Sequence, residues 1–223
     1  MNNKKFCIVA NAQFKIKSVR LFQSLKYRII ALDGAFNKLL KESIYPHYII
    51  GDMDSISNAS KDQFNNFNGI VISKNNQDET DLEYAIKYLV HHYLPTDITI
   101  IGAINGARQD HMLCNLLLLK KLHHRDISIS ILEKYHRIEY FENQEKTICT
   151  ALNRKIGFIG FKEAYITCDS VNPMYPKALE YPLDSYHLNF EKQYSVSNIL
   201  LSDHIRFFIE GCAIITLPNM LQS

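Results

Sequence analysis

Several features are scarce or missing in this 223-residue sequence, and each absence disfavours a class of protein. Neither G-x-x-x-x-G-K-[ST] nor G-x-G-x-x-G occurs, and the chain has only eight glycines, which disfavours a P-loop kinase or a nicotinamide dehydrogenase. No stretch approaches the roughly 18 apolar residues of a membrane span. The five cysteines are scattered without a C-x-x-C pair, which disfavours a zinc site or a disulfide framework. Tryptophan is absent.

The charge is balanced, with 25 Lys and Arg against 23 Asp and Glu. A polybasic face for nucleic acid is therefore not expected. The apolar run at 6–10 is too short for the core of a signal peptide and predicts a first strand instead. Together with reduced cysteines, these features predict a soluble, cytoplasmic protein that binds neither nucleic acid nor membrane.

Up to residue 136, short β-branched runs alternate with helical patterns. Most runs are continuously apolar, as in strands buried on both faces of a parallel sheet. We expect strands at 6–10, 28–32, 47–50, 69–73, 97–102 and 127–132. Thr80 is placed to cap one helix, and a second is expected at 110–124. This alternation predicts a doubly wound, mostly parallel α/β domain over residues 1–136.

Beyond residue 136 the helical periodicity fades and short runs with turn residues between them take over. Strands are expected at 138–141, 147–151, 155–161, 164–168, 194–201, 206–210 and 213–217. Four of the six prolines fall in this part. Many short strands at close spacing predict a small all-β sandwich over residues 137–223.

Polar motifs follow four of the expected strands of the α/β domain, where open α/β sheets bind ligands. The motifs are Asp33-Gly34-Ala35, Gly51-Asp52-Met53-Asp54-Ser55, Asp78-Glu79-Thr80-Asp81 and Gly106-Ala107-Arg108-Gln109-Asp110-His111. The aspartates of the second motif are two apart and those of the third are three apart, so each pair is expected to converge. Two bare charges at ~4 Å repel by about 4 kcal/mol at an effective dielectric near 20, and Mg²⁺ removes that repulsion. The site is interpreted as a metal–triphosphate platform.

Each motif alone has a simpler interpretation. A single D-x-D is usually a turn with a capping aspartate, the third motif resembles a helix cap, and Arg108 alone is most often a surface salt-bridge partner. Four such motifs at successive strand ends are much harder to explain as caps.

The ordered motifs D-G-A, G-D-x-D-S-I, D-x-T-D and G-[GA]-R-x-D-H-x-x-x-N-L resemble the thiamine pyrophosphokinase family. Tyr181-Pro182-Leu183 and Val196-Ser197-Asn198 extend the resemblance into the second half. The sequence departs from the family pattern in having one glycine after Asp33, Ala107 for a glycine, and Gln77 for a lysine. It also has Ile215 where some members place a tryptophan that stacks on thiamine.

The resemblance implies Mg²⁺-dependent transfer of a pyrophosphoryl group from ATP to the thiamine hydroxyl, giving thiamine diphosphate and AMP. It implies Mg²⁺ held by Asp52, Asp54, Asp78 and Asp81. The ATP side is expected to include Asp33, Thr80, Arg108, Asp110 and His111. Ser197 and Asn198 are expected near thiamine. The resemblance also implies a homodimer in which the β domain of one subunit closes the active site of the other.

The residues expected to act in catalysis are Asp52, Asp54, Asp81 and Arg108, with Asp81 or Asp54 orienting the hydroxyl. Two alternatives stay open. One is a pyrophosphokinase for another hydroxymethyl compound such as a pterin, against which the second-half motifs speak. The other is a non-catalytic sensor of a nucleotide or of thiamine diphosphate, against which the complete set of carboxylates speaks.

Overall fold

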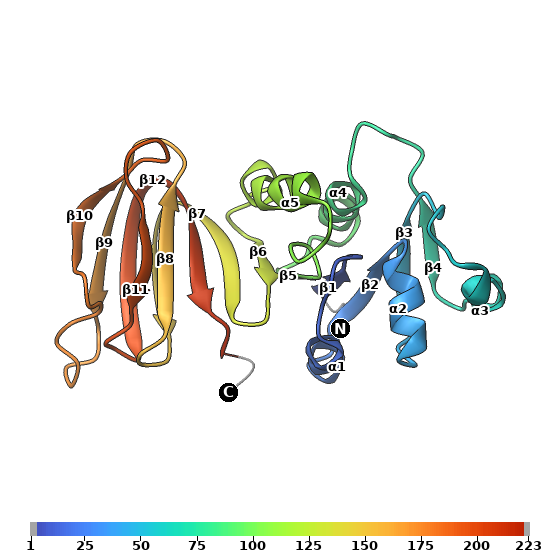
Figure 1. The fold of residues 1–223 in the computed structure, drawn as a ribbon, viewed down its shortest axis with the longest axis horizontal. Helices are drawn as coiled ribbons and strands as arrows, with labels where there is room; N and C mark the ends of the chain where they lie inside the picture. The colour runs from blue at the N-terminus through green and yellow to red at the C-terminus, as the bar shows by residue number, and fades with distance from the viewer. Residues whose placement is uncertain (1–3, 221–223) are drawn as a thin grey trace. The chain divides into compact units, whose positions relative to one another are not determined.

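The structure is a computed structural model that describes residues 4–220, and it divides into two compact units. The first unit ends at Glu133 and the second begins at Lys134. Figure 1 shows the helices and strands of both units. Over residues 4–220, no helix combines the length and the apolar composition needed to cross a membrane.

The first unit is built on a parallel sheet. Its strands are β1 (Lys5–Val9), β2 (Arg28–Leu32), β3 (Tyr48–Gly51), β4 (Ile70–Ser73), β5 (Asp97–Ile101) and β6 (Ser128–Leu132). They pair in the order β6-β5-β1-β2-β3-β4 with every register parallel. Each strand expected from the apolar runs is confirmed, with ends that differ by at most one residue.

Helices cover both faces of this sheet. They are α1 (Ile16–Ser24), α2 (Ala35–Lys41), the short α3 (Lys61–Asn65) after a 3₁₀ turn at Asn58–Ser60, α4 (Asp81–Tyr93) and α5 (Gln109–Lys121). Figure 1 shows α1 and α2 on one side of the sheet and α4 and α5 on the other. Helices on both faces of a parallel sheet make this a doubly wound α/β unit, as predicted.

The pleat of the strands explains the two faces, because successive side chains point to opposite sides. Cys7 and Ile49 belong to one buried cluster with Phe22 of α1 and Phe36 of α2. The neighbouring Phe6 and Tyr48 instead have ring contacts with Tyr93 at the end of α4. These strands consist of continuous apolar runs because helices pack against both faces of the sheet.

The second unit is antiparallel. Its strands are β7 (His136–Cys149), β8 (Lys155–Gly160), β9 (Ala164–Ser170), β10 (Leu183–Leu188), β11 (Ser195–Ile199) and β12 (His204–Pro218). The long β12 pairs with β7 along one edge. Along its other edge it pairs first with β9 and then, beyond Gly211, with β8.

Gly211 marks the point where β12 changes partner. Its φ of +85° lies in the left-handed region, and a Cβ there would be 2.6 Å from the carbonyl oxygen of Glu163. The register with β7 shifts at the same place, which makes a β-bulge. The bulge lets β9–β10 and β8–β11 separate into two layers around a shared core.

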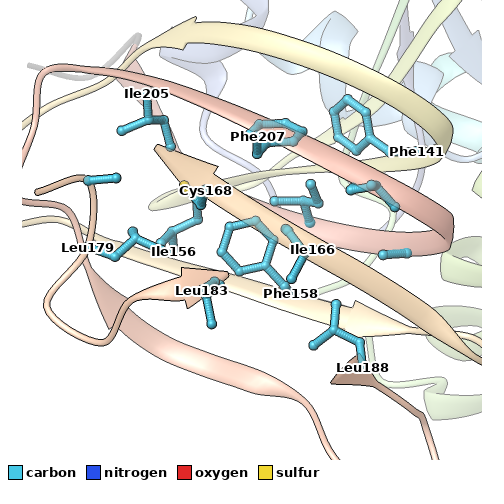
Figure 2. Packing of buried hydrophobic residues seen from close by; sticks show 14 of the residues in the cluster. Phe141, Ile156, Phe158, Ile166, Cys168, Leu179, Leu183, Leu188, Ile205 and Phe207 are labelled. Carbon is cyan, nitrogen blue, oxygen red and sulfur yellow. The ribbon is translucent and has the colours of Figure 1, made fainter. Parts of the chain in front are cut away.

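That core consists of side chains from both layers. Phe158 of β8 and Phe207 of β12 are fully buried, and their ring centroids are 6.3 Å apart. Figure 2 shows them with Ile166 and Leu183, which come from β9 and β10. The interleaved layers fit the predicted β-sandwich.

Three details of the second unit differ from the prediction. The expected strands at 138–141 and 147–151 are one strand, β7, and those at 206–210 and 213–217 are one strand, β12. The polar residues between these runs belong to β7, because their backbones pair with β12. Their side chains alternate between exposed and partly buried positions. The strand β10 was not expected, because only its end residues Leu183 and Leu188 are fully buried.

Candidate active site

A cavity of about 520 Å³ opens at the carboxyl ends of the strands of the first unit. Its wall includes residues that follow β1, β2, β3, β4 and β5, such as Asn11, Asp33, Asp52, Lys74 and Ala103. The sheet order reverses between β1 and β5, so this is the switch point at which open α/β sheets bind ligands. The cavity therefore lies at the strand ends that the polar motifs follow.

Three carboxylates meet beside this cavity. Asp33, Asp52 and Asp54 each offer an oxygen, and these oxygens lie within 4.8 Å of one another. We call these residues the acidic cluster. Met53 has a φ of +66°, so the chain turns between Asp52 and Asp54, and their carboxylates lie close together in this turn. The Ser55 hydroxyl donates to Asp54 Oδ1 at 2.9 Å.

Asp33 is the buried member of the acidic cluster, with 6% of its surface exposed. Its Oδ2 accepts the backbone N–H of Ser55 at 3.2 Å, while its Oδ1 is buried and has no hydrogen-bond partner within residues 4–220. Burial raises the pKa of Asp33, the Ser55 bonds oppose the shift, and Asp54 and Asp52 add to it. An unpartnered buried carboxylate oxygen costs free energy unless a cation or proton binds it.

The approach of Asp33 to the motif after β3 requires Gly51. Its φ is +154°, and a Cβ there would lie 2.9 Å from the Cβ of Asp33. A side chain at this position would push the two strand ends apart, so the glycine of G-D-x-D-S is needed for the cluster to close.

Asp81 begins α4 and lines the same cavity. Thr80 caps this helix as predicted, because its Oγ1 accepts the Glu83 N–H at 3.1 Å. Burial raises the pKa of Asp81, Lys74 opposes the shift, and the charges of Asp52 and Asp54 add to it. The charges of the acidic cluster therefore act on Asp81, although Asp81 is not one of its three members.

Lys74 was missed by the sequence reasoning, although it lines the cavity and is only 6% exposed. Its Nζ lies 3.2 Å from Asp81 Oδ1 and donates to the Glu79 carbonyl at 2.8 Å. It stands directly after an expected strand, as the predicted site residues do. That position was the available signal, but a single lysine outside any motif does not reveal that it is buried.

Asp78 is placed differently from the other predicted metal ligands. It is exposed, its backbone N–H bonds Asn76 Oδ1 at 2.8 Å, and it is not among the described residues that line the cavity or form the acidic cluster. The three-residue spacing to Asp81 crosses the start of α4, so it does not put both side chains on one helical face.

The fourth motif contributes a basic side to the cavity, where Arg108 and His111 form part of the wall. The Arg108 guanidinium bonds Asp110 through Nε at 2.9 Å and Nη2 at 2.5 Å, and this pair holds the pKa of Asp110 well below its usual range. Both side chains are exposed, so the pair is open to exchange with an anionic ligand. Asn115 supports the wall by donating to the Ala103 carbonyl at 2.7 Å.

Ser197 and Asn198 lie in the second unit, on β11. Asn198 is buried, and its side-chain amide makes two bonds with the backbone of Tyr181: it donates to the carbonyl at 2.7 Å and accepts the N–H at 3.1 Å. This links the two second-half motifs to each other. Ser197 is exposed and has a φ of +58°, so its hydroxyl is the accessible one of the pair.

The residues present fit a hard divalent cation. The acidic cluster supplies carboxylate oxygens from three residues, which is the donor type that Mg²⁺ takes in nucleotide sites. The unpartnered Oδ1 of Asp33 is the specific sign that the cluster is incomplete by itself.

A doubly wound unit with a carboxylate-lined cavity at its switch point, followed by a β-sandwich, defines a protein suited to binding a small ligand together with a divalent cation. The comparisons with known proteins make this specific. Residues 19–131 match the family model described as thiamin pyrophosphokinase, catalytic domain. The chain belongs to the thiamin pyrophosphokinase family.

Individual relatives agree with this. Thiamine pyrophosphokinase of Bacillus subtilis (strain 168) is 28% identical over 188 residues, which cover 83% of this chain and 84% of that protein. The crystal structure of the Bacillus subtilis enzyme covers 98% of this chain and 100% of its own, with a TM-score of 0.81 and 27% identity. Yeast thiamin pyrophosphokinase, at 15% identity, shares the fold with a TM-score of 0.78 over 98% of this chain and 87% of its own.

Proposed function

We propose that this enzyme transfers a pyrophosphoryl group from ATP to the hydroxyl of thiamine and that it requires Mg²⁺. The observation that carries the proposal is the unpartnered, buried Asp33 Oδ1 within the acidic cluster, at the switch point of the sheet. Family membership supplies the reaction, and the cluster supplies the place where a metal–triphosphate complex would bind.

The acidic cluster would hold Mg²⁺, and Asp81 faces the same cavity. When bound, the metal would neutralise the carboxylates and the charge on the triphosphate oxygens. Binding the metal–nucleotide complex fixes the β-phosphorus for attack, and most of the acceleration of phosphoryl transfer comes from such positioning and charge neutralisation.

Arg108 would leave Asp110 to bind the phosphates, since the exposed pair is readily exchanged. Asp54 is exposed and accepts the Ser55 hydroxyl, whereas Asp81 is engaged by Lys74. We therefore assign to Asp54 the orientation of the thiamine hydroxyl. His111, on the cavity wall beside Arg108, would contact the nucleotide.

The thiamine side of the proposal rests on the second unit. Ser197 would contact thiamine, and Asn198 would hold the Tyr181 segment in place through its two backbone bonds. The active enzyme is proposed to be a homodimer, with the β-sandwich of one subunit completing the site of the other, in the cytoplasm.

The test is incubation with ATP, Mg²⁺ and thiamine, followed by separation of the products. AMP and thiamine diphosphate in equal amounts are expected. ADP as the product would contradict pyrophosphoryl transfer, turnover only with a pterin alcohol would support the other hydroxymethyl substrate, and nucleotide binding without turnover would indicate a sensor.

A pair of variants tests the metal assignment in the same assay. Asp52→Asn should lower kcat/KM at limiting Mg²⁺ by on the order of a hundredfold or more, because it removes a member of the acidic cluster. Asp78→Asn should change it by less than about threefold, because Asp78 lies outside the cluster. Equal losses in both variants would restore Asp78 to the metal site.

A further inference from the structure

Lys74 is a buried basic residue of the cavity that the proposed mechanism leaves unused. A lysine ammonium is almost never buried unless it is paired. The Lys74 side chain is 5% exposed, and it is paired with a carboxylate on the cavity wall, Asp81, whose own side chain is 31% exposed. A cation held on the wall of a cavity rich in acidic groups calls for an explanation.

The surrounding charge is strongly negative. Asp33, Asp52 and Asp54 form the acidic cluster, and Asp81 feels the charges of two of them. Arg108, the other strongly basic residue that lines the described cavity, is bonded to Asp110. Lys74 therefore supplies the compensating charge on the Asp81 side. A divalent cation approaching Asp81 would have to compete with it.

The Lys74 backbone is fixed, while its side chain has room to change partner. Its N–H donates to the Gly51 carbonyl at 2.8 Å, immediately before Asp52. The ammonium is held by two partners, the Glu79 carbonyl and Asp81, at the end of a flexible four-carbon stem. Release of Asp81 would leave a donor on the wall of the cavity where the triphosphate is proposed to lie.

We propose that Lys74 is an exchangeable counter-ion: it holds Asp81 while the site has no metal, yields it to the divalent cation, and then donates to the phosphate oxygens of the nucleotide. This inference rests on the proposed function. Lys74 acts first as a positioning residue for Asp81 and then as a phosphate ligand.

The proposal predicts effects of opposite sign. Without Lys74 a divalent cation would meet no competitor at Asp81 and one positive charge fewer, so the cation alone should bind more tightly. The nucleotide would lose a phosphate donor, so its KM should rise and kcat should fall. A residue that only supports the fold would weaken metal binding, nucleotide binding and thermal stability together.

The experiment measures Mn²⁺ binding to the full chain by electron paramagnetic resonance, without nucleotide, alongside steady-state kinetics. For Lys74→Met we expect about tenfold tighter Mn²⁺ binding. We also expect the KM for ATP to be at least about tenfold higher and kcat at least about tenfold lower. Lys87→Met is the matched control, because Lys87 is a half-exposed lysine that pairs with Glu79 and Glu83, neither of which belongs to the acidic cluster. It should leave Mn²⁺ affinity and turnover unchanged.

Further variants keep the test decisive if Lys74→Met is unstable. Lys74→Arg keeps the charge and should bind Mn²⁺ no more tightly than the wild type. In an Asp81→Asn background, Lys74→Met should change Mn²⁺ affinity by less than about twofold, because the contested carboxylate is gone.

The outcomes separate the two proposals. A wild type that binds no Mn²⁺ would overturn the metal site and the role of Lys74 with it. Mn²⁺ binding by the wild type with equal or weaker binding by Lys74→Met would overturn only the exchange role.

Discussion

At the scale of single residues, Asp33 is a buried carboxylate of the site with one unpartnered oxygen. Burial raises its pKa above the unfolded value, the Ser55 bonds oppose this, and Asp54 and Asp52 reinforce it. The folded protein therefore holds a proton on Asp33 at pH values where the unfolded chain has released it. Stability from this group is present at low pH and is lost as pH rises through the folded pKa.

Asp33→Asn should consequently stabilise the metal-free protein at neutral pH. We expect Tm to rise by about 2–4 °C at pH 7–8 for a gain of ~1 kcal/mol. The difference from the wild type should shrink as the pH falls toward the ordinary aspartate pKa of about 3.9, because the charge that the variant removes is increasingly neutralised in the wild type. Thermal melts in the presence of a chelator, at a series of pH values, measure this.

Magnesium should reverse the order of the two proteins. It should raise the Tm of the wild type more than that of Asp33→Asn, because the variant has lost a carboxylate of the acidic cluster. A variant that is less stable than the wild type at neutral pH without metal would show that Asp33 is not a strained group.

The residue scale also shows what the sequence could and could not predict. Asp52 and Asp81 were expected at the ends of strands and line the cavity, and Asp54 lies beside Asp52 in the acidic cluster. The place of Asp33 in the acidic cluster depends on the tight contact at Gly51 and the Met53 turn, which spacing alone does not express. Lys74 was missed because burial of one lysine is a property of the tertiary structure.

At the scale of elements, the Asn198 amide adds two hydrogen bonds to the backbone bonds that join the end of β11 to the Tyr181 segment. Asn198→Ala would leave the N–H and carbonyl of Tyr181 without these partners. These bonds are partly buried, so their loss together is expected to cost about 1–3 kcal/mol. A fall in Tm of roughly 3–10 °C is therefore expected.

Ser197→Ala provides the matched comparison, because Ser197 is exposed and adjacent. It should leave the Tm within about 1 °C of the wild type and raise the KM for thiamine. Calorimetry and thiamine titrations separate the two roles. Equal Tm values for both variants would mean that the amide does not hold the segment.

The elements of the two units were not equally predictable. In the α/β unit, β1, β2, β3, β5 and β6 are mostly buried, and the edge strand β4 is largely exposed. All six are apolar runs in the sequence, so their positions were evident. In the β-sandwich, Glu142–Lys146 is polar yet lies within β7, since the strand continues into solvent while still pairing with β12. Backbone pairing does not require apolar side chains, so the hydrophobicity pattern of the sequence does not reveal it.

At the scale of the whole molecule, the proposed sharing of active sites between subunits can be tested by mixing inactive variants. Asp52→Asn damages the cavity of the first unit, and Ser197→Trp is designed to block the thiamine side of the second. In a mixed dimer, one site would carry both defects and the other neither. Random assortment should then restore about a quarter of wild-type activity.

The control is a mixture of either variant with itself, which should stay inactive. Sedimentation or light scattering gives the dimer content of each mixture. Mixed dimers without recovered activity would indicate that each subunit forms its own site.

The partner change of β12 at Gly211 has a consequence for how the second unit is synthesised and folds. Its pairs with β7 join residues as far apart as His136 and Pro218, and it also supplies partners for β8 and β9. Such non-local pairing folds slowly because long loops must close first. A ribosome that stalled before Gly211 would release β8 without its β12 partner, and that open strand edge would favour aggregation over folding.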